Sequence, residues 1–355
     1  MVPEKSIMEI VNVEAAIRWQ AEHSTRNGAP ATGRLLLGLV PLLETDLAVG
    51  EKMRTWPGLS LEAAMPLRIA GGFHNLHLTG GDDRLGPIYR GEATDQDAVD
   101  AIVLAVATDH DAALLPWFDG PPQTNEAGRS AGVMAALLWL SGQIGPRFAL
   151  FELGSSAGIN TMLDRFDFDL GGVRAGVEDS PMKIAPEWRG PPPPAAPVEI
   201  VSVRGCDVAP IDLLDPAQAL RLKSYVWAEV TERLARIDAA VALASQRRPD
   251  VVRRDAGEFV ASVLSEEPPY GVARVLFHTI VWQYLPAETR AAITAAMEAA
   301  GARATADSPL AWIKIETNRQ TFRHEIRVRY WPGGAEEHVL GTVHAHGAWL
   351  EWFGV

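Results

Sequence analysis

The first part of the chain carries apolar residues at spacings of three and four, the pattern of amphipathic helices. This pattern runs through residues 35–43 and again through residues 98–107. A third apolar run, residues 126–140, follows Asn125, which we expect to cap a helix. Alternation of apolar and polar positions, typical of half-buried strands, is nearly absent before residue 145. We therefore predict an α-helical N-terminal domain over residues 1–145.

From about residue 148 the pattern changes to short apolar runs, rich in β-branched residues, that alternate with helical stretches. The predicted strands are 148–153, 198–203, 250–253, 272–277 and 310–315. The predicted helical stretches are 159–165, 217–245, 258–264 and 287–300. Alternation of strands and helices predicts a parallel sheet covered by helices on both faces.

The end of the chain breaks this alternation. Residues 324–330 and 339–353 predict two strands joined around Pro332-Gly333-Gly334, without a helix between them, which indicates a hairpin. Residues 186–197, with four consecutive prolines, predict an irregular loop. The fold class expected for residues 146–355 is therefore α/β, with a doubly wound, mostly parallel sheet and a C-terminal antiparallel hairpin.

Composition and charge limit the classes of partner. A chain of 355 residues is long enough for about two domains. Its formal net charge of −13 disfavours nucleic acid, which requires a basic face. A single cysteine, Cys206, excludes an internal disulfide and suits a reducing compartment. The N-terminus lacks the apolar core of a signal peptide, and the apolar runs are too short to span a bilayer. We expect a cytoplasmic protein that binds neither nucleic acid nor membrane.

The segment Gly154-Ser155-Ser156-Ala157-Gly158, directly after the first predicted strand, has two interpretations. It fits G-x-S-x-G, the turn that exposes a nucleophilic serine, with His344 or His346 as the triad histidine. It also fits a glycine-rich cofactor loop that begins at Glu152. A nucleophile elbow belongs to a sheet with several strands before the serine. The helical pattern upstream therefore favours the cofactor loop. The spacing of the glycines does not match the dinucleotide fingerprint G-x-G-x-x-G.

Acidic residues follow the next two predicted strands. Asp207 comes after the second strand and Asp255 after the third. Open parallel sheets bind ligands at the carboxyl ends of their strands, near the point where the strand order reverses. A carboxylate there can accept both hydroxyls of a ribose, and hydrogen bonds to charged groups contribute about 1.5–3 kcal/mol each. The alternative is that such aspartates only cap turns.

The order Glu152-Leu-Gly154-Ser-Ser-Ala-Gly158, Gly205-Cys-Asp207 and Asp255-Ala256, with the closing hairpin, resembles the class I S-adenosylmethionine-dependent methyltransferases over residues 148–355. The whole chain, including Thr124-Asn-Glu-Ala-Gly-Arg-Ser130, is also similar to a bacterial family known only as a domain of unknown function. The methyltransferase resemblance implies S-adenosylmethionine as cofactor. It implies these contacts: Glu152, Gly154 and Gly158 beside the methionine part, Ser155, Ser156 and Asn160 in the same loop, Asp207 at the ribose and Asp255 at the adenine amine.

The chain departs from the methyltransferase pattern in two places. Ser156 stands where the motif usually has glycine, and a Cβ there limits how closely the backbone approaches the cofactor. About forty residues separate Gly158 from the second strand, an insertion that contains the proline run. The ribose contact therefore remains open between Asp207, Asp212 and Asp215.

Methyl transfer mainly requires that the acceptor be held against the methyl carbon, and some acceptors also need a general base. His278, at the end of the fourth predicted strand, is the candidate base; alternatively it only forms a hydrogen bond at a helix start. Glu126 and Arg129 share a helix face and are candidates for substrate contact or for an ion pair. His74 and His77 lack an evident third ligand, so no metal is expected.

Three functions remain open at this stage. The first is a methyltransferase with a small-molecule acceptor, since the Asp/Asn-Pro-Pro-aromatic signature of many enzymes that methylate amines of nucleic acids or proteins is missing. The second is a ligand- or partner-binding protein without catalysis on the same fold. The third is a serine hydrolase that uses Ser156. Dimerisation through the helical domain is a further open point, and the acceptor is not identified.

Overall fold

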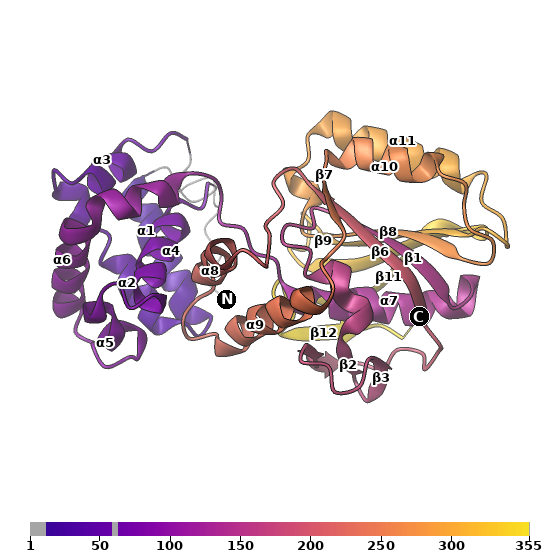
Figure 1. Cartoon of the computed structure of the whole chain (residues 1–355), viewed down its shortest axis with the longest axis horizontal. Coiled ribbons are helices and arrows are strands. Elements are labelled where there is room, and N and C mark those ends of the chain that lie inside the picture. Colours follow the sequence, from indigo (N-terminus) through magenta and orange to yellow (C-terminus); the bar gives the residue numbers. More distant parts are fainter. Residues whose placement is uncertain (1–11, 59–62, 355) are drawn as a thin grey trace. The chain divides into compact units, whose positions relative to one another are not determined.

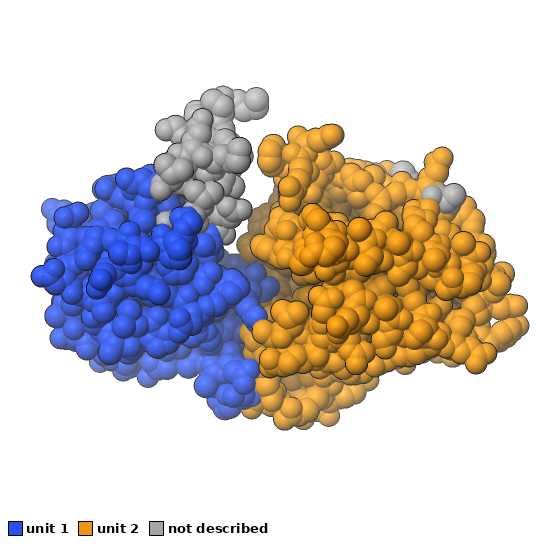
Figure 2. Space-filling view, turned by 90° about the horizontal axis from the view of Figure 1, so that it is seen from above, with its two compact units in different colours: residues 1–124, 215–237 blue, residues 125–214, 238–355 orange. Residues whose placement is uncertain are grey.

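The computed structural model describes residues 12–58 and 63–354; residues 1–11, part of the segment that argued against a signal peptide, lie outside this range. The chain divides into two compact units, shown in different colours in Figure 2. Unit 1 comprises residues 1–124 and 215–237, and unit 2 comprises residues 125–214 and 238–355. The sequence predicts a single boundary near residue 145. The structure instead assigns residues 125–145 to unit 2 and residues 215–237 to unit 1.

Unit 1 is helical. Its helices are α1 (Val13–Arg26), α2 (Pro30–Leu37), α3 (Ala48–Arg54), α4 (Met65–Leu78), α5 (Gly86–Tyr89), α6 (Gln96–Leu114) and α8 (Pro216–Ser224). The predicted run 98–107 lies within α6, whereas the run 35–43 is divided between α2 and a 3-10 turn, Pro41–Glu44. Gly38 ends α2 close to α6, because a Cβ at this position would lie 2.8 Å from Cγ2 of Val103.

The predicted helix 217–245 is two helices, α8 and α9 (Thr231–Gln246). Asp215 caps α8 by accepting hydrogen bonds from the backbone N–H groups of Ala217 and Gln218. Between the helices, the Glu229 carboxylate accepts from the N–H groups of Ala31 and Thr32 at 2.6 and 2.9 Å. These bonds satisfy the free N–H groups at the start of α2 and hold the second segment of unit 1 to the first.

Unit 2 is built on a nine-stranded sheet in the order β5-β12-β11-β10-β9-β8-β1-β6-β7. Five parallel strands correspond to the five predicted ones: β1 (Arg147–Leu153), β6 (Glu199–Asp207), β7 (Val251–Arg253), β8 (Ala273–Thr279) and β9 (Leu310–Thr317). The sheet is therefore mixed but mostly parallel, as predicted. From β1 the chain adds β6 and β7 on one side and then β8 and β9 on the other, so the strand order reverses between β1 and β8.

The last part of the sheet has more strands than predicted. β10 (His324–Trp331), β11 (Gly334–Val343) and β12 (Trp349–Trp352) form an antiparallel meander, so the predicted second hairpin strand is divided in two. The proline-rich segment, expected to be irregular, contains the short strand β5 (Glu187–Arg189), which pairs with β12. The insertion also forms a small second sheet from β2 (Asp167–Leu170), β3 (Val173–Gly176) and β4 (Lys183–Ile184).

Helices cover both faces of the large sheet. α10 (Ala256–Ser265) and α11 (Ala287–Gly301) lie side by side over one face (Figure 1) and share a core with Phe151, Leu153 and Leu276. α7 (Ser130–Ile144) covers the other face, where Gly132 approaches Ile315 so closely that a Cβ would lie 2.7 Å from Cδ1. α7 is buried on all sides over its first eleven residues, which explains why its apolar positions show no amphipathic period.

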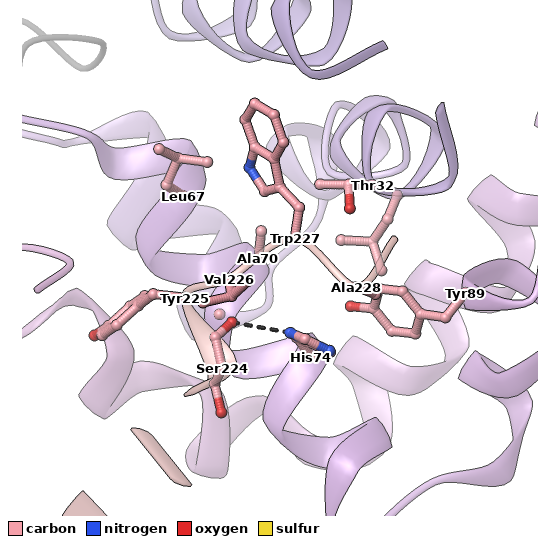
Figure 3. Close-up of a pocket in the computed structure, with 12 residues that line it drawn as sticks. Thr32, Leu67, Ala70, His74, Tyr89, Ser224, Tyr225, Val226, Trp227 and Ala228 are labelled. Carbon is pink, nitrogen blue, oxygen red and sulfur yellow. Dashed lines mark hydrogen bonds between the residues drawn. The ribbon is translucent and has the colours of Figure 1, made fainter. Parts of the chain in front are cut away.

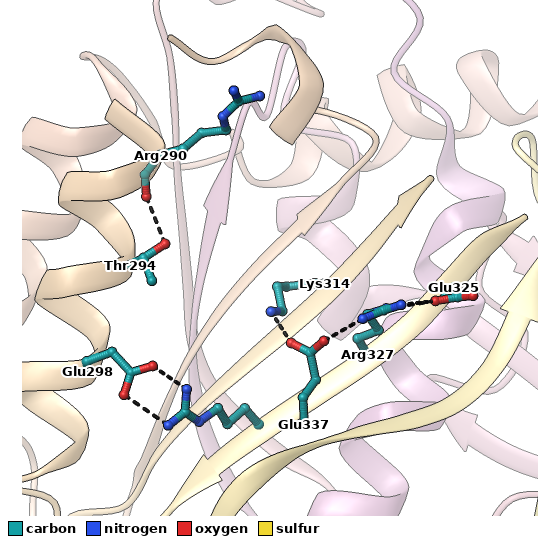
Figure 4. A network of polar contacts seen from close by, with 8 residues as sticks. Arg290, Thr294, Glu298, Lys314, Glu325, Arg327 and Glu337 are labelled. Carbon is teal, nitrogen blue, oxygen red and sulfur yellow. Dashed lines mark hydrogen bonds and ion pairs between the residues drawn. The ribbon is translucent and has the colours of Figure 1, made fainter. Parts of the chain in front are cut away.

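Charged side chains tie β9, β10 and β11 together and fasten α11 to the sheet (Figure 4). The Glu337 carboxylate accepts from Lys314 and, at 2.8 Å, from Arg327. Burial raises the pKa of Glu337, but these two cations outweigh it and hold the pKa below its usual value. Arg329 forms a two-pronged pair with Glu298 of α11. The network fixes the register of the strands that end at the candidate site. In the described part of the chain, no helix is long and apolar enough to cross a membrane.

Candidate functional site

The carboxyl ends of β6, β1, β8 and β9 lie at one edge of the large sheet, and we call this edge with its loops the carboxyl edge. The order of strands reverses here, between β1 and β8. Crevices outside such reversal points are the usual ligand sites of open parallel sheets. Glu152, Asp207 and His278 all lie in the last two residues of their strands. The structure therefore brings these three predicted residues to the same edge.

Three residues other than glycine adopt left-handed backbone conformations at this edge. They are Ser156 after β1 (φ 51°), Ile280 after β8 (φ 54°) and Phe322 between β9 and β10 (φ 55°). A positive φ is a genuine outlier for a β-branched residue such as Ile280. Backbone strain of this kind concentrates at functional sites. The carboxyl edge is thus marked by backbone conformation as well as by topology.

The glycine turn packs tightly against the neighbouring strands. Gly154 (φ 66°) and Gly158 (φ 72°) both need the conformational freedom of glycine. A Cβ on Gly154 would lie 2.3 Å from Cγ2 of Val281, and one on Gly158 would lie 2.6 Å from Cγ2 of Val251. Both glycines thus permit contacts within the protein. The helix predicted over 159–165 is a 3-10 helix, Asn160–Arg165.

Glu152 lies beneath this turn with only 2% of its surface exposed. Burial raises the pKa of its carboxyl to about 8. Hydrogen bonds from Ser155 and Asn160 lower this pKa, but by less than burial raises it. Within the described residues, Oε2 of Glu152 and Oδ1 of Asn160 are buried without a hydrogen-bond partner. Buried polar atoms normally have partners, so these two oxygens are candidates to accept hydrogen bonds from a ligand.

Asp207 and Asp255 both hold backbone N–H groups. Asp207 accepts from Ser156 through Oδ2 and from Ala209 through Oδ1, each at 2.8 Å. Asp255 caps α10 through Oδ1, which accepts from Gly257 at 2.7 Å. A carboxylate has about four acceptor positions, so these bonds leave room for ligand hydroxyls.

The two other candidates for the ribose contact have different partners. Asp212 caps its own turn through Leu214 and pairs with Arg248 at 3.1 Å, and Asp215 caps α8 in unit 1. Of the three aspartates, Asp207 is the one bound to the glycine turn.

His278 lies on the opposite face of the sheet from Glu152, because it is in register with Leu153 and successive side chains alternate. Its Nδ1 donates to Oε1 of Glu316 at 2.6 Å, and its ring stacks on Trp282 at 4.9 Å between centroids. Nε2 is buried without a partner in the described part of the protein. The sequence did not single out Glu316. Glu316 could have been found by the criterion that identified Asp207, namely an acidic residue at the carboxyl end of a parallel strand.

Glu126 and Arg129 lie in a 3-10 turn before α7. The Arg129 guanidinium donates to the carbonyls of Ala345 at 2.8 Å and Thr279 at 3.1 Å, so it links this turn to the end of β8 and to the loop before β12. Glu126 lies 3.8 Å from Nδ1 of His346. Asn125 does not cap the helix, so that prediction was wrong. Its Oδ1 accepts from the N–H of Ile159 at 2.8 Å and ties the segment to the glycine turn.

The remaining histidines fall into separate places. His344 and His346 lie together in the loop between β11 and β12, where the N–H of His346 donates to Nδ1 of His344. His338 lies in the middle of β11, stacks on Tyr330 and packs at a tilt against Trp139. Among residues 12–58 and 63–354, no group of three or more histidine, cysteine or acidic side chains is arranged to hold a metal ion.

His74 and His77 belong to unit 1, where His74 lines a small cavity of about 20 Å³ (Figure 3). Nδ1 of His74 donates to the carbonyl of Ser224 at 3.1 Å, and burial lowers the pKa of the ring to about 4. His77 stacks against Tyr89 at 4.8 Å between centroids. A cavity of this size holds about one water molecule, so it is no site for a substrate.

Comparison with known proteins gives one family. The family model described as "Uncharacterized protein conserved in bacteria (DUF2332)" matches residues 14–352. No curated protein and no solved structure matches the chain.

Proposed function

The chain belongs to the uncharacterised bacterial family DUF2332, whose description names no activity, and we propose from the carboxyl edge that it is a methyltransferase. Unit 2 would bind S-adenosylmethionine at this edge and transfer its methyl group to a small cytoplasmic acceptor. The observation that carries the proposal is Glu152: a buried carboxyl with an unpartnered oxygen, beneath a glycine turn, where the strand order reverses.

The strand order supports this proposal. The parallel part, β7-β6-β1-β8-β9, is a doubly wound arrangement in which acids follow the first three strands in chain order. This arrangement supports the proposal, because it brings the acids of the resemblance over residues 148–355 to one edge of the sheet. The antiparallel β10 then continues beside β9 as a meander.

The fit of the residues to the cofactor rests on polar groups and not on the glycines. Side chains meet the Cβ positions of Gly154 and Gly158, so neither glycine argues for a ligand. The unpartnered oxygens of Glu152 and Asn160 argue for a ligand, because the positively charged ammonium group of the methionine part would donate hydrogen bonds to them. Asp207, which already holds the turn, would accept the ribose hydroxyls through its remaining acceptor positions, and Asp255 the adenine amine.

The cofactor, when bound, supplies a methyl group on a sulfonium, which is an electrophile without further activation. The protein then has to hold the acceptor in line and remove its proton. His278 is the base that we propose, with its Nδ1 proton held by Glu316 so that the unprotonated Nε2 can take the proton of the acceptor. Nε2 is buried, and the partly exposed Trp282 stacks on the ring, so a shift of Trp282 is the direct way to open it. Arg129 and Glu126 would orient the acceptor.

Equilibrium dialysis with labelled S-adenosylmethionine tests this proposal. The Asp207→Asn variant should weaken binding about tenfold or more, since it removes a charge-assisted acceptor. Asp212→Asn is the matched control, because Asp212 also caps a turn after β6 but pairs with Arg248, and it should leave binding unchanged. Equal loss in both variants, or no binding by the wild type, would contradict the proposal. Binding without turnover on a panel of metabolites would indicate a ligand-binding protein instead.

One observation favours a second candidate, a serine hydrolase. Ser156 has φ 51°, and the nucleophilic serine of a G-x-S-x-G elbow also sits on a strained turn. Against it, β1 is the first strand in the described part of the chain, and the N–H of Ser156 is held by Asp207. Labelling of the wild type but not of Ser156→Ala by a fluorophosphonate would support the hydrolase. Absence of labelling in both would exclude it.

A further inference from the structure

The insertion between the glycine turn and β6 borders a partly open cavity of about 310 Å³ within unit 2. Its walls come from α7, the 3-10 helix Asn160–Arg165, β3 and the segment that leads into β6. Ile200, one of the lining residues, pairs with Phe148 near the amino ends of β6 and β1. The cavity is therefore placed toward the opposite end of these strands from the carboxyl edge and is distinct from the proposed cofactor site.

One wall of the cavity is apolar. Val198 and Ile200 line it, and both are half-buried. A volume of 310 Å³ is about that of ten water molecules in the liquid, at about 30 Å³ each. A ligand with a short hydrocarbon group fits this space and would displace water from apolar side chains, which is favourable.

The polar groups of the cavity carry opposite charges. Asp164 accepts from Arg247 through Oδ2, while its Oδ1 is buried without a partner among the described residues. Arg174 of β3 is 57% exposed, pairs with Asp167 at 2.6 Å and lies 3.7 Å from the carboxylate of Asp169. A guanidinium has five N–H donors, so this pair leaves donors that can bind a further carboxylate. The cavity thus offers an acceptor for an ammonium group, a donor for a carboxylate and an apolar wall.

We propose that this cavity is a binding site for a small zwitterion with an aliphatic group, that is, an α-amino acid with an apolar side chain. The ammonium group binds Oδ1 of Asp164, the carboxylate binds Arg174, and the side chain lies against Val198 and Ile200. The insertion, which the methyltransferase pattern lacks, builds three of the four walls, so the site is formed mainly by a segment that departs from that pattern. It does not depend on the proposed methyltransferase activity.

Calorimetric titration of the full chain tests the site with three probes: L-leucine, 3-methylbutylamine, which lacks the carboxylate, and 4-methylpentanoate, which lacks the amine. We expect leucine to bind with a Kd below about 1 mM, and each truncated probe to bind about tenfold or more weakly, since each loses a charged hydrogen bond. Asp164→Asn should weaken binding of leucine and of the amine but not of 4-methylpentanoate. Arg174→Gln should weaken binding of leucine and of the carboxylate but not of the amine.

Two further variants separate binding from folding. Ala196→Phe narrows the cavity from the half-buried segment before β6 and should abolish leucine binding at an unchanged Tm. Asp250→Asn removes an exposed acid that pairs with Arg204 outside the cavity and should bind leucine as the wild type does. Failure of leucine to bind at about ten times the expected Kd limit, or binding that survives both Asp164→Asn and Ala196→Phe, would overturn the proposal.

Discussion

Nδ1 of His278 donates to Oε1 of Glu316 at 2.6 Å, and the same oxygen accepts the backbone N–H groups of Val281 at 3.1 Å and Trp282 at 3.2 Å. One carboxylate from β9 thus fixes both the imidazole at the end of β8 and the strained turn that follows it at Ile280. Glu316 is a positioning residue in this account, since it orients His278 and does not itself touch the acceptor.

Replacing Glu316 by alanine removes all three hydrogen bonds and leaves their donors in a mostly buried place. We expect the free energy of unfolding to fall by about 3 kcal/mol, measured by chemical denaturation. Glu187→Ala is the matched control, because Glu187 pairs with Arg189 on the surface, where an ion pair contributes about 1 kcal/mol or less. Equal losses in the two variants would show that the Glu316 contacts do not hold the turn.

The Glu152 carboxyl predicts a specific dependence of stability on pH. Burial raises its pKa from 4.5 to about 8. Between pH 4.5 and about 8, the Glu152 carboxyl therefore keeps its proton in the folded state and has lost it in the unfolded state. Stability should therefore fall as the pH rises from about 5 to 8, by a total on the order of 5 kcal/mol for this group alone, at about 1.4 kcal/mol for each pH unit.

The Glu152→Gln variant isolates this contribution, since glutamine has a similar shape and does not titrate. Its Tm should vary less with pH between 5 and 8 than the Tm of the wild type, and it should exceed the wild-type value at pH 8. Parallel profiles for the two proteins would show that Glu152 is ionised in the folded state and would contradict the neutral carboxyl.

Because Gly154 packs against Val281, one added methyl group at Gly154 should lower the free energy of unfolding substantially. Gly154→Ala introduces a Cβ 2.3 Å from the valine and also places alanine at φ 66°. Gly80→Ala is the control for backbone strain alone, because it has φ 65° and no atom within 4 Å of the added Cβ. We expect about 1–2 kcal/mol of destabilisation in Gly80→Ala and about 2 kcal/mol more in Gly154→Ala, measured by denaturation. Equal costs would mean that the valine moves aside freely.

The five parallel strands could be predicted because each is a short apolar run followed by a helical stretch, and a strand buried on both faces needs that composition. The elements that were predicted as one and that the structure divides into two could not be predicted in this way. The run 217–245 reads as one helix by its period, and only the binding of Glu229 to Ala31 and Thr32, far away in sequence, shows why the chain turns between α8 and α9. The strands of the small second sheet have two to four residues, too few for a periodic pattern.

The candidate site was predictable to a similar extent. Glu152, Asp207 and His278 end strands of the same sheet, so strand prediction alone places them at one edge. Which face each side chain occupies depends on the register of β8 against β1, which the sequence does not show. The contact of Asn125 with Ile159 depends on tertiary packing and left no local pattern, whereas Glu316 carried the same signal as Asp207, an acid at the carboxyl end of a parallel strand.

The most direct test of the central claim is a calorimetric titration of the full chain with S-adenosylmethionine at pH 7, in two buffers with different heats of ionisation. If the cationic cofactor binds beside Glu152, whose pKa of about 8 leaves it mostly protonated at this pH, binding should release close to one proton. The Glu152→Gln variant should release none. Absence of binding, or binding by the wild type without release of a proton, would contradict the account.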